Sequence, residues 1–481
     1  MRTHVAGGRV IDPASGLDAV ADIWIADGVI VGIGTPPSGF EADRRIDATG
    51  FCVLPGLVDL SFTPGPANDW LGAFAGGITT VAAGVAADAA FASSAAATPH
   101  RTMAPRLLPV GPMCVDTSNQ RLSDFGRLRQ SGCIAWSPGR PVPGRHGTPP
   151  MRADARSGRN GGGKDRSDTA DREPSRAERT GSAAIDPHVL WRAMQYARGL
   201  GGALWLPPVD AALAHGGVAG AGAYAARLGL DSVPVVAETL ALAQIFALQR
   251  DTGARVHLSQ ITSAEGVALV REAKREGLPV TCDVAAHHLH VIDLDIGFYD
   301  PRYRLDPPLR GSRDRDALRA GVADGTIDAV CSHHRVVPPE HADAPFAYAA
   351  AGAADGPLLA SLVLKWARET GVSPVQALAR ITTGPAAVVA ATQPALPRAG
   401  RLEVGVPADF CLFDIDDFWL VPDGEPHGGA AGGATGGATG GATGGATGAA
   451  FYGRTPFSGM PMTGRVTATY IHGECVWRAA Q

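Results

Sequence analysis

The chain has 481 residues, of which 45% are hydrophobic and 19% are charged, so it can bury a large core and is not globally disordered. Its formal net charge of −5 gives no basic field that would hold nucleic acid or an anionic membrane. The seven cysteines form no CxxC pair and are odd in number, which argues against a disulfide framework and against a cysteine-type zinc site.

The first residues, MRTHVAGGRVIDP, have no apolar segment behind Arg2, so no signal peptide is predicted. No uninterrupted apolar run reaches the roughly 18 residues that a membrane span needs. We therefore expect a soluble, cytoplasmic protein.

Short β-strands are predicted at both ends of the chain. Near the start, apolar runs at 23–26 and 29–33 are joined by Asp27-Gly28, a pair typical of tight hairpins. Near the end, strands are predicted at 410–413, 465–471 and 474–477, with a turn at Gly473. Because each region is too small to fold alone, we expect the two to pair into one β-sandwich beside the central part.

Between these ends, apolar strands alternate with helical patterns. Eight strands are predicted, at 57–60, 79–83, 107–110, 134–136, 203–206, 255–258, 280–284 and 329–332. The clearest helices are predicted at 235–250, 264–276, 314–323 and 357–369. Eight β/α repeats indicate an α/β fold of the TIM (β/α)8 barrel type, in which catalytic groups lie at the C-terminal ends of the strands.

Two segments fall outside this pattern. Residues 139–182 are rich in Arg, Asp, Gly, Ser and Pro with almost no large apolar side chains, so we expect a disordered insertion. Residues 428–450 contain four consecutive GGAT units from Gly432, which predict a flexible low-complexity loop. The predicted organisation is residues 1–53 as the N-terminal part of the sandwich, 54–399 as the barrel, and 400–481 as the C-terminal part of the sandwich.

Side chains of the kinds that metals bind lie at the ends of four predicted strands. Asp210 follows the strand at 203–206, His257 lies in the next strand, and the last two strands end at His287-His288 and His333-His334. Imidazole and carboxylate are usual zinc ligands, and barrel strands end on one rim. Each residue alone could equally be a satisfied or exposed polar group.

The segment LPGLVDLSFT, at residues 54–63, resembles the opening of amidohydrolase barrels. In that family, two histidines at alternate positions after the aspartate point into the barrel mouth, because side chains of a strand alternate with a period of two. Here these positions hold Ser61 and Thr63. A hydroxyl group is a poor substitute for imidazole as a neutral ligand.

Almost the whole chain outside the two biased segments resembles a bacterial class I dihydroorotase. The motifs that carry the resemblance are, in order, GRVIDP at 8–13, PGLVDL at 55–60, GITTV at 77–81, PVVAE at 234–238, ARVH at 254–257, HHL at 287–289, DPPLR at 306–310, DGTIDA at 324–329 and TPF at 455–457. The resemblance implies a TIM barrel flanked by a small β-sandwich from both termini, in agreement with the pattern above.

The resemblance also implies a reaction, the reversible ring closure of carbamoyl aspartate to dihydroorotate. In the family, a metal-bound hydroxide attacks the ring amide, and an aspartate at strand 8 moves the proton. The family's metal-ligand positions fall on Ser61, Thr63, Asp210, His257 and His287. The strand-8 aspartate position falls on His333, so two ligands and the proton-moving group are altered.

The substrate-binding positions of the family are altered as well. Its arginine after the paired histidines falls on Gly65, its strand-2 asparagine on Ala86, and its asparagine before Pro-Pro-Leu-Arg on Asp306. Charge-assisted contacts contribute about 1.5–3 kcal/mol each. Loss of the arginine and an asparagine is therefore expected to weaken binding of a dicarboxylate roughly a hundredfold or more.

These departures favour a non-catalytic dihydroorotase homologue in pyrimidine biosynthesis. The resemblance then implies a pseudo-dihydroorotase that is the structural partner of the aspartate transcarbamoylase catalytic chain in an oligomeric assembly. The alternative is an active zinc-dependent dihydroorotase or related cyclic-amide hydrolase, with Asp210, His257 and His287 around one metal and His333 as extra ligand or base. A third reading is a barrel with a binding role unrelated to pyrimidines. We expect no cofactor, although the same three residues could hold a residual zinc ion weakly.

Overall fold

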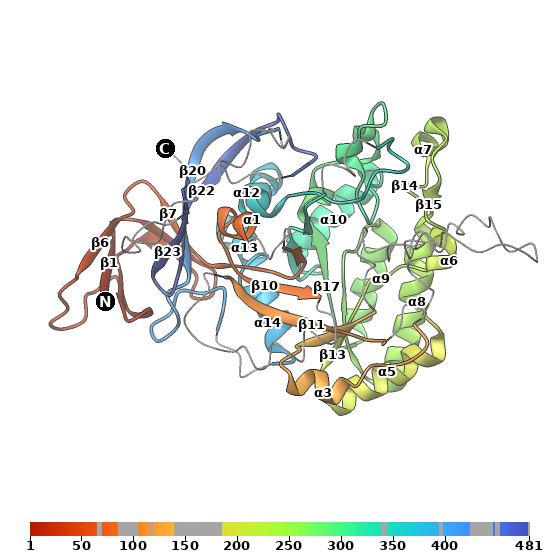
Figure 1. Cartoon of the computed structure of the whole chain (residues 1–481), viewed down its shortest axis with the longest axis horizontal. Coiled ribbons are helices and arrows are strands. Elements are labelled where there is room, and N and C mark those ends of the chain that lie inside the picture. The colour runs from red at the N-terminus through yellow and green to blue at the C-terminus, as the bar shows by residue number, and fades with distance from the viewer. Residues whose placement is uncertain are drawn as a thin grey trace, which may run out of the picture.

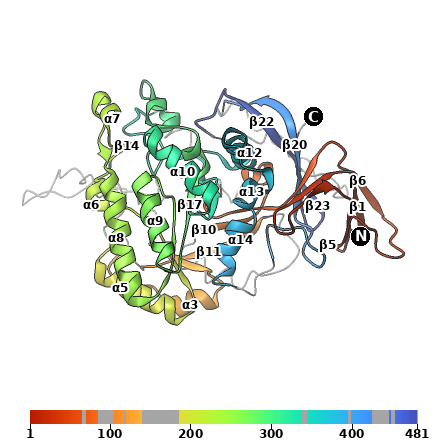
Figure 2. The same cartoon turned by 180° about the vertical axis from the view of Figure 1, so that it is seen from behind.

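The computed structural model describes residues 1–64, 70–84, 104–115, 119–138, 185–337, 344–393, 398–423, 446–447 and 453–479. A β-sandwich containing both ends of the chain lies beside a larger α/β barrel (Figures 1 and 2). The insertion predicted at 139–182 lies outside the described residues. The predicted loop at 428–450 does too, except for Ala446–Thr447.

Two sheets form the sandwich. The first has the order β5-β4-β1-β6 and consists of β1 (Arg2–Ala6), β4 (Ile23–Ala26), β5 (Val29–Ile33) and β6 (Arg44–Asp47). The second has the order β21-β23-β22-β20-β7-β2-β3 and consists of β2 (Arg9–Asp12), β3 (Leu17–Val20), β7 (Cys52–Pro55), β20 (Phe410–Leu420), β21 (Ala446–Thr447), β22 (Pro461–Ile471) and β23 (Glu474–Arg478). Apolar side chains from both sheets, among them Ile25, Val53, Phe410 and Tyr470, form one buried cluster.

The second sheet contains strands from both ends of the chain, as predicted. Strand β7 pairs parallel with β2 and antiparallel with β20, with Pro55 opposite Phe410. Because β7 continues to Pro55, the sandwich crosses the predicted boundary between residues 53 and 54. The last half of the fourth GGAT unit also departs from the predicted loop, since it forms β21 beside β23.

The central part is a barrel of eight parallel strands in chain order, which confirms the predicted TIM barrel. The strands are β8 (Leu57–Asp59), β10 (Ile78–Gly84), β11 (Arg106–Pro112), β12 (Ala135–Ser137), β13 (Ala203–Leu206), β16 (Arg255–Leu258), β17 (Val280–Ala285) and β18 (Ala329–Cys331). Two short strands, β9 (Phe62–Thr63) and β19 (His334–Arg335), extend β8 and β18 and pair with each other. This pair joins the first and last strands at the carboxyl end of the barrel.

Most of the helices cover the outside of the barrel, whereas the helix at 223–228 projects away from the barrel strands (Figures 1 and 2). The helices are α1 (Leu71–Ala75), α3 (Phe125–Gln130), α5 (Pro187–Gly199), α6 (Ala211–Ala214), α7 (Ala223–Leu228), α8 (Val235–Thr252), α9 (Ala264–Arg275), α10 (Ser312–Asp324), α12 (Leu359–Thr370), α13 (Pro374–Ala379) and α14 (Thr383–Ala390). Single-turn helices η2 (Ala286–Leu289), η3 (Asp293–Ile296), η4 (Pro301–Tyr303) and η5 (Gly356–Leu358) and a two-strand ribbon of β14 (Ala219–Gly220) and β15 (Ser232–Val233) lie in the connections. Helices α5, α8 and α9 lie side by side in Figure 2.

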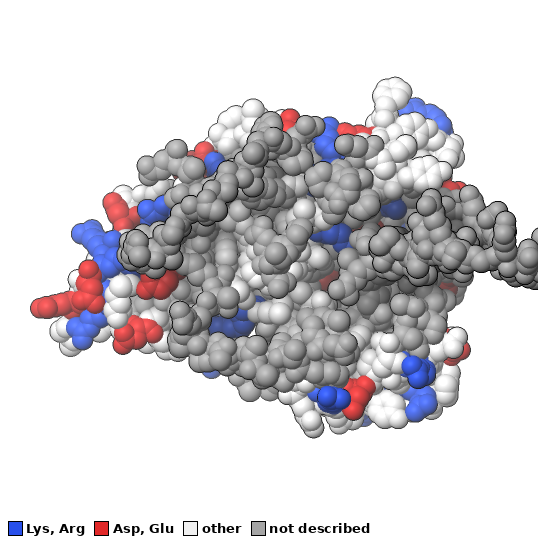
Figure 3. All heavy atoms as spheres, viewed as in Figure 1, with Lys and Arg blue, Asp and Glu red and all other residues white. Residues whose placement is uncertain are grey.

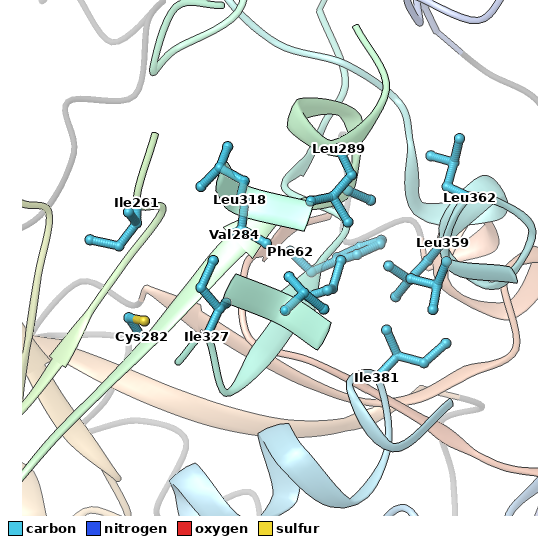
Figure 4. Packing of buried hydrophobic residues seen from close by; sticks show 14 of the residues in the cluster. Phe62, Ile261, Cys282, Val284, Leu289, Leu318, Ile327, Leu359, Leu362 and Ile381 are labelled. Atoms are coloured by element: carbon cyan, nitrogen blue, oxygen red, sulfur yellow. The ribbon is translucent and has the colours of Figure 1, made fainter. Parts of the chain in front are cut away.

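Buried apolar side chains form two layers around the barrel wall. The outer layer lies between helices and strands and includes Leu318 of α10, Leu359 of α12 and Val284 of β17 (Figure 4). A smaller cluster includes Val58, Ala82, Trp205, Ala329 and Val389. Because its members come from β8, β10, β11, β12, β13 and β18 and from α14, it fills part of the barrel interior.

Charges of both signs are interspersed at the end of the molecule where β1 and β6 lie, on the face shown in Figure 3. In the part of the chain that the structure describes, no helix is both long enough and apolar enough to cross a membrane.

Candidate functional site

Most of the predicted site residues lie at the carboxyl rim of the barrel, where β8, β16, β17 and β18 end. The β9–β19 pair places Phe62 opposite His334, and their rings stack with centroids 4.4 Å apart. His334 Nδ1 also accepts a hydrogen bond from the Gly356 backbone N–H at 3.0 Å. The first and last strands therefore form one packed unit at the rim.

Asp59, at the end of β8, is a buried carboxyl group that links this unit. One of its oxygens accepts hydrogen bonds from the backbone N–H of Ser61 at 3.1 Å and of Ser332 at 3.2 Å, and the other contacts the Ser332 hydroxyl. Burial raises the pKa of Asp59 to about 7, because desolvation disfavours the charged form more than the hydrogen bonds favour it. The group can therefore hold a proton near neutral pH while it joins β8 to β18.

His257, on β16, is held by two side chains of the neighbouring strand β17. Its Nδ1 lies 2.9 Å from Thr281 Oγ1, and its Nε2 lies 3.0 Å from Asp283 Oδ2. Its ring packs against Trp205, with centroids 4.8 Å apart, and the side chain is 1% exposed. Both ring nitrogens are therefore engaged by the protein itself, and a metal would have to displace one of these contacts.

Gln260 lies just beyond β16 and reaches the end of β8. Its Nε2 donates a hydrogen bond to Ser61 Oγ at 3.0 Å, and its backbone N–H donates to Asp283 Oδ1 at 2.7 Å. Its φ of 63° is in the left-handed region that non-glycine residues rarely adopt. Its Oε1 is buried without a hydrogen-bond partner among the described residues. The first predicted ligand position, Ser61, is thus occupied by a hydrogen bond to an amide.

His287, in η2, is oriented by a carboxylate from a distant loop. Its Nδ1 lies 2.8 Å from Asp355 Oδ2, and the other oxygen of Asp355 accepts a hydrogen bond from the Thr455 hydroxyl. Its Nε2 is buried and has no hydrogen-bond partner in the described ranges. The His288 and His333 rings lie nearby, with centroids 4.7 and 6.0 Å from that of His287. In the tautomer whose Nδ1–H donates to Asp355, the buried Nε2 keeps a lone pair that can accept one hydrogen bond.

Asp210 and Thr63 lie apart from the hydrogen-bonded groups around His257 and His287. Asp210 caps α6, because its Oδ1 accepts a hydrogen bond from the Leu213 backbone N–H at 2.8 Å. Thr63 lies in β9, paired with Arg335, and is exposed. Neither contacts His257 or His287 through a described hydrogen bond.

Of the remaining predicted positions, His333 lies beside His287, with ring centroids 6.0 Å apart. His333 has a left-handed backbone, with φ of 52°, between β18 and β19. Asp306 is exposed in the loop before α10. Gly65 and Ala86 lie outside the described residues.

The structure does not bring Asp210, His257 and His287 together as metal ligands. Among the residues it describes, no three His, Cys, Asp or Glu side chains are grouped so that they could hold a metal ion. Asp210 caps a helix, His257 bonds within the barrel wall, and His287 bonds to Asp355. The described residues therefore assemble no donor set for a zinc centre, and weak binding of residual zinc stays a prediction.

Sequence analysis did not identify Gln260, Ser332, Asp355 or Thr455 as site residues. Gln260 and Ser61 are 199 positions apart, and His287 and Asp355 are 68 apart, so no local pattern links them. The one available signal was that Ser332 is the last residue of a predicted strand and that Gln260 lies two residues beyond another, at the level of the rim.

Comparisons of sequence give a consistent group of relatives. No family model matches the chain. A dihydroorotase-like protein of Pseudomonas aeruginosa is 32% identical over 490 aligned residues, which cover 98% of this chain and 99% of that protein. A dihydroorotase of Anaeromyxobacter sp. strain K is 31% identical over 489 residues, covering 98% of this chain and 97% of that protein.

Comparisons of structure agree on the fold. The L-hydantoinase of Arthrobacter aurescens superposes with a TM-score of 0.74 at 20% identity, covering 100% of this chain and 96% of that one. A D-hydantoinase superposes with a TM-score of 0.73 at 18% identity, covering 99% and 95% of the two chains. At these identities the likeness shows the architecture, a barrel joined to a sandwich, and nothing about the substrate.

Proposed function

The chain belongs to the dihydroorotase family of amidohydrolases, and from this premise we propose that it is a member without the metal-dependent ring hydrolysis, retained as a structural partner. The observation that carries the proposal is the hydrogen bond from Gln260 to Ser61 at the rim. It lies at the position where the resemblance to the family places a histidine ligand.

The hydroxyl at residue 61 is a poor donor to a metal. Neutral imidazole and carboxylate supply the lone pairs that zinc prefers, whereas the Ser61 oxygen here accepts an amide N–H. The second histidine position holds Thr63, which is exposed on β9. Ser61 and Thr63, at the first two ligand positions of the family, therefore supply no metal ligand of the usual kind.

The proton-moving position is altered too. A carboxylate stands at the end of strand 8 in the family, and this chain has His333 there in a left-handed conformation. General acid–base catalysis is typically worth 10²–10⁴-fold in rate. Asp59, the nearby buried carboxyl group, is committed to the Ser332 backbone and hydroxyl. It therefore supports the barrel wall and does not replace the missing group.

The altered substrate-binding positions also argue against the family reaction. Asp306 stands where the resemblance places an asparagine, and a carboxylate there repels a dicarboxylate substrate. The change adds to the expected loss of affinity from the absent arginine.

An assay of both directions of the family reaction tests the proposal. Purified full-length chain, supplied with zinc, is expected to show no dihydroorotate hydrolysis and no carbamoyl aspartate cyclisation above a protein-free blank. The Anaeromyxobacter dihydroorotase, assayed in parallel, is the positive control. Turnover in the ordinary enzyme range of about 1–10³ s⁻¹ would contradict the proposal and favour the rebuilt zinc centre.

The structural role is proposed for the barrel and sandwich surface, with the aspartate transcarbamoylase catalytic chain as partner. The resemblance to a pseudo-dihydroorotase supports this choice. A chain without turnover that keeps a closed barrel and a two-ended sandwich is consistent with a surface that another protein needs.

A further inference from the structure

Gln260 joins the two ends of one half of the barrel rim. It follows β16, and its side chain donates a hydrogen bond to Ser61, which follows β8. In the order of the barrel, β17 and β18 lie between β16 and β8, because β18 is joined to β8 through the β9–β19 pair. His287 and His333 follow β17 and β18. Gln260 and His287 therefore extend from the same half of the rim, formed by β16, β17, β18 and β8, which we call the half-rim.

Two buried atoms of the half-rim accept hydrogen bonds and have no partner among the residues that the structure describes. They are Oε1 of Gln260, a residue 4% exposed, and Nε2 of His287, a residue 1% exposed. The other contacts of the two groups fix these roles, since the Gln260 amide N–H donates to Ser61 and the His287 Nδ1–H donates to Asp355. Buried polar atoms in native proteins are nearly always paired, so these two indicate a bound hydrogen-bond donor.

A buried carboxylate lies behind each of the two acceptors. Asp283 is 1% exposed and accepts the Gln260 backbone N–H at 2.7 Å, and Asp355 is 0% exposed and holds His287 at 2.8 Å. Over the described ranges of the chain, both carboxylates pair with a histidine, and neither pairs with an arginine or a lysine. Buried negative charge without such a partner attracts a cation and repels an anion, and it does so most strongly where water is scarce.

Solvent reaches the half-rim at two residues. Ser61 and His333 are partly exposed, whereas Gln260 and His287 are buried. The Ser61 hydroxyl accepts the Gln260 amide, and the His333 ring centroid lies 6.0 Å from that of His287. Each buried acceptor group therefore has a partly exposed neighbour, from whose side a small molecule can approach.

We propose that the half-rim binds a small organic cation of the amidinium class, whose N–H groups donate to Gln260 Oε1 and His287 Nε2. An amidinium group has N–H donors on both nitrogens and no acceptor, so it complements two atoms that only accept. Its positive charge is attracted by Asp283 and Asp355. The inference rests on the proposed absence of a bound metal, because a metal on His287 Nε2 would take the same lone pair.

Three molecules of the same size and shape separate the effects of charge and of donors. Acetamidinium is a cation with donors on both of its nitrogens, acetamide is neutral with donors on its single nitrogen, and acetate is an anion without donors. Full-length chain with isotope-labelled histidine rings is titrated with each molecule by nuclear magnetic resonance, with a metal chelator present and sodium chloride added to equalise the ionic strength. His287→Gln identifies the His287 signal.

Acetamidinium is expected to shift the His287 signal to saturation. It should bind at least about tenfold more tightly than acetamide, because charge-assisted hydrogen bonds are roughly twice as strong as neutral ones. Acetate is expected to leave the signal unchanged, because it offers no N–H donor and carries the repelled charge.

Gln260→Met removes the amide acceptor at a similar side-chain length and is expected to weaken acetamidinium binding by at least about tenfold. His188→Gln, at an exposed residue in the first turn of α5, is the control and should keep the wild-type affinity. Circular dichroism verifies folding, and the three titrations of the wild-type chain decide the proposal even where a variant does not fold.

Three results would each overturn the proposal. They are a His287 signal that acetamidinium does not shift, acetate binding as tight as acetamidinium binding, and wild-type affinity in Gln260→Met. The first would leave ordered water as the partner of the two acceptors. Because the titration uses a chelator and no dihydroorotate, its outcome is separate from that of the turnover assay.

Discussion

Asp59 makes the wall between the first and last barrel strands sensitive to pH. Its pKa in the folded chain is raised to about 7 from a usual value near 3.8, because the carboxyl group is buried. The unfolded chain therefore releases this proton at a lower pH than the folded chain does. The contribution to stability is complete below about pH 4 and is lost as the pH rises to about 7.

Asp59→Asn is expected to remove this dependence, because an amide keeps the uncharged shape at every pH. Its free energy of unfolding should match wild type near pH 4 and exceed it by roughly 2–4 kcal/mol at pH 8. Urea unfolding at the two pH values measures the difference. Asp316→Asn, at a side chain 62% exposed, is the control and should follow the wild-type profile. A variant less stable than wild type at pH 8 would show that the ionised carboxylate is needed.

His257 is expected to act as a structural residue of the barrel wall. His257→Ala removes two hydrogen bonds, and Asp283, which is buried, keeps only the Gln260 backbone N–H among the contacts described above. The free energy of unfolding should fall by about 3–5 kcal/mol. The control, His188→Ala on the exposed start of α5, should change it little. A metal chelator that reduced wild-type stability to the level of His257→Ala would show instead that a metal engages this residue.

At the scale of elements, the barrel is closed by a two-residue strand pair and by the contacts of Ser332. The Ser332 hydroxyl contacts Asp59 and accepts the His334 backbone N–H at 3.1 Å. These contacts join β8 to β18 and position β19 against β9. The Ser332 side chain and the β9–β19 pair therefore act at the same junction between the first and last barrel strands.

Ser332→Ala is expected to lower the free energy of unfolding by about 1–3 kcal/mol, because buried polar groups lose their partner. A double-mutant cycle with Asp59→Asn at pH 5 should show a coupling energy of at least about 0.5 kcal/mol. Strictly additive effects would mean that the two residues stabilise the barrel independently.

Strands with long apolar runs could be predicted, whereas the two-residue strands could not. The run Ala203–Leu206 is buried on both faces, as is typical of parallel barrel strands, and the predicted and observed bounds agree. Strands β9 and β19 have two residues each, which is too short for a periodic pattern, so only their pairing with each other defines them as strands. The site residues show the same contrast between features set by local sequence and features set by tertiary contacts. Residues that directly follow strands were found, but their partners, such as Asp355 for His287, depend on contacts across the fold.

At the scale of the whole molecule, the proposed assembly with aspartate transcarbamoylase should use folded surface. The composition of the GGAT units predicts a flexible loop, and ordering such a loop on binding would cost conformational entropy and weaken any contact that it makes. Because Ala446–Thr447 pair with β23, a clean deletion stops at residue 443.

Full-length chain and a variant lacking residues 432–443 are both expected to co-elute with the aspartate transcarbamoylase catalytic chain after co-expression. Light scattering on the eluted complex gives its mass. Absence of co-elution for the full-length chain would contradict the partnership, and loss in the deletion variant alone would place the repeats in the interface.

The pairing of β7 with β20 has a consequence for the synthesis of the protein. Pro55 and its neighbours meet Phe410 only after about 350 further residues have been made. At ribosomal rates of roughly 5–20 residues per second, one edge of β7 stays unpaired for about 20–70 s. The β9–β19 pair, which joins the first and last barrel strands, can form only after about 270 further residues have been made. The nascent chain therefore presents open apolar strand edges for most of its elongation, and its yield in cells should depend on chaperones that cover such edges until the last strands emerge.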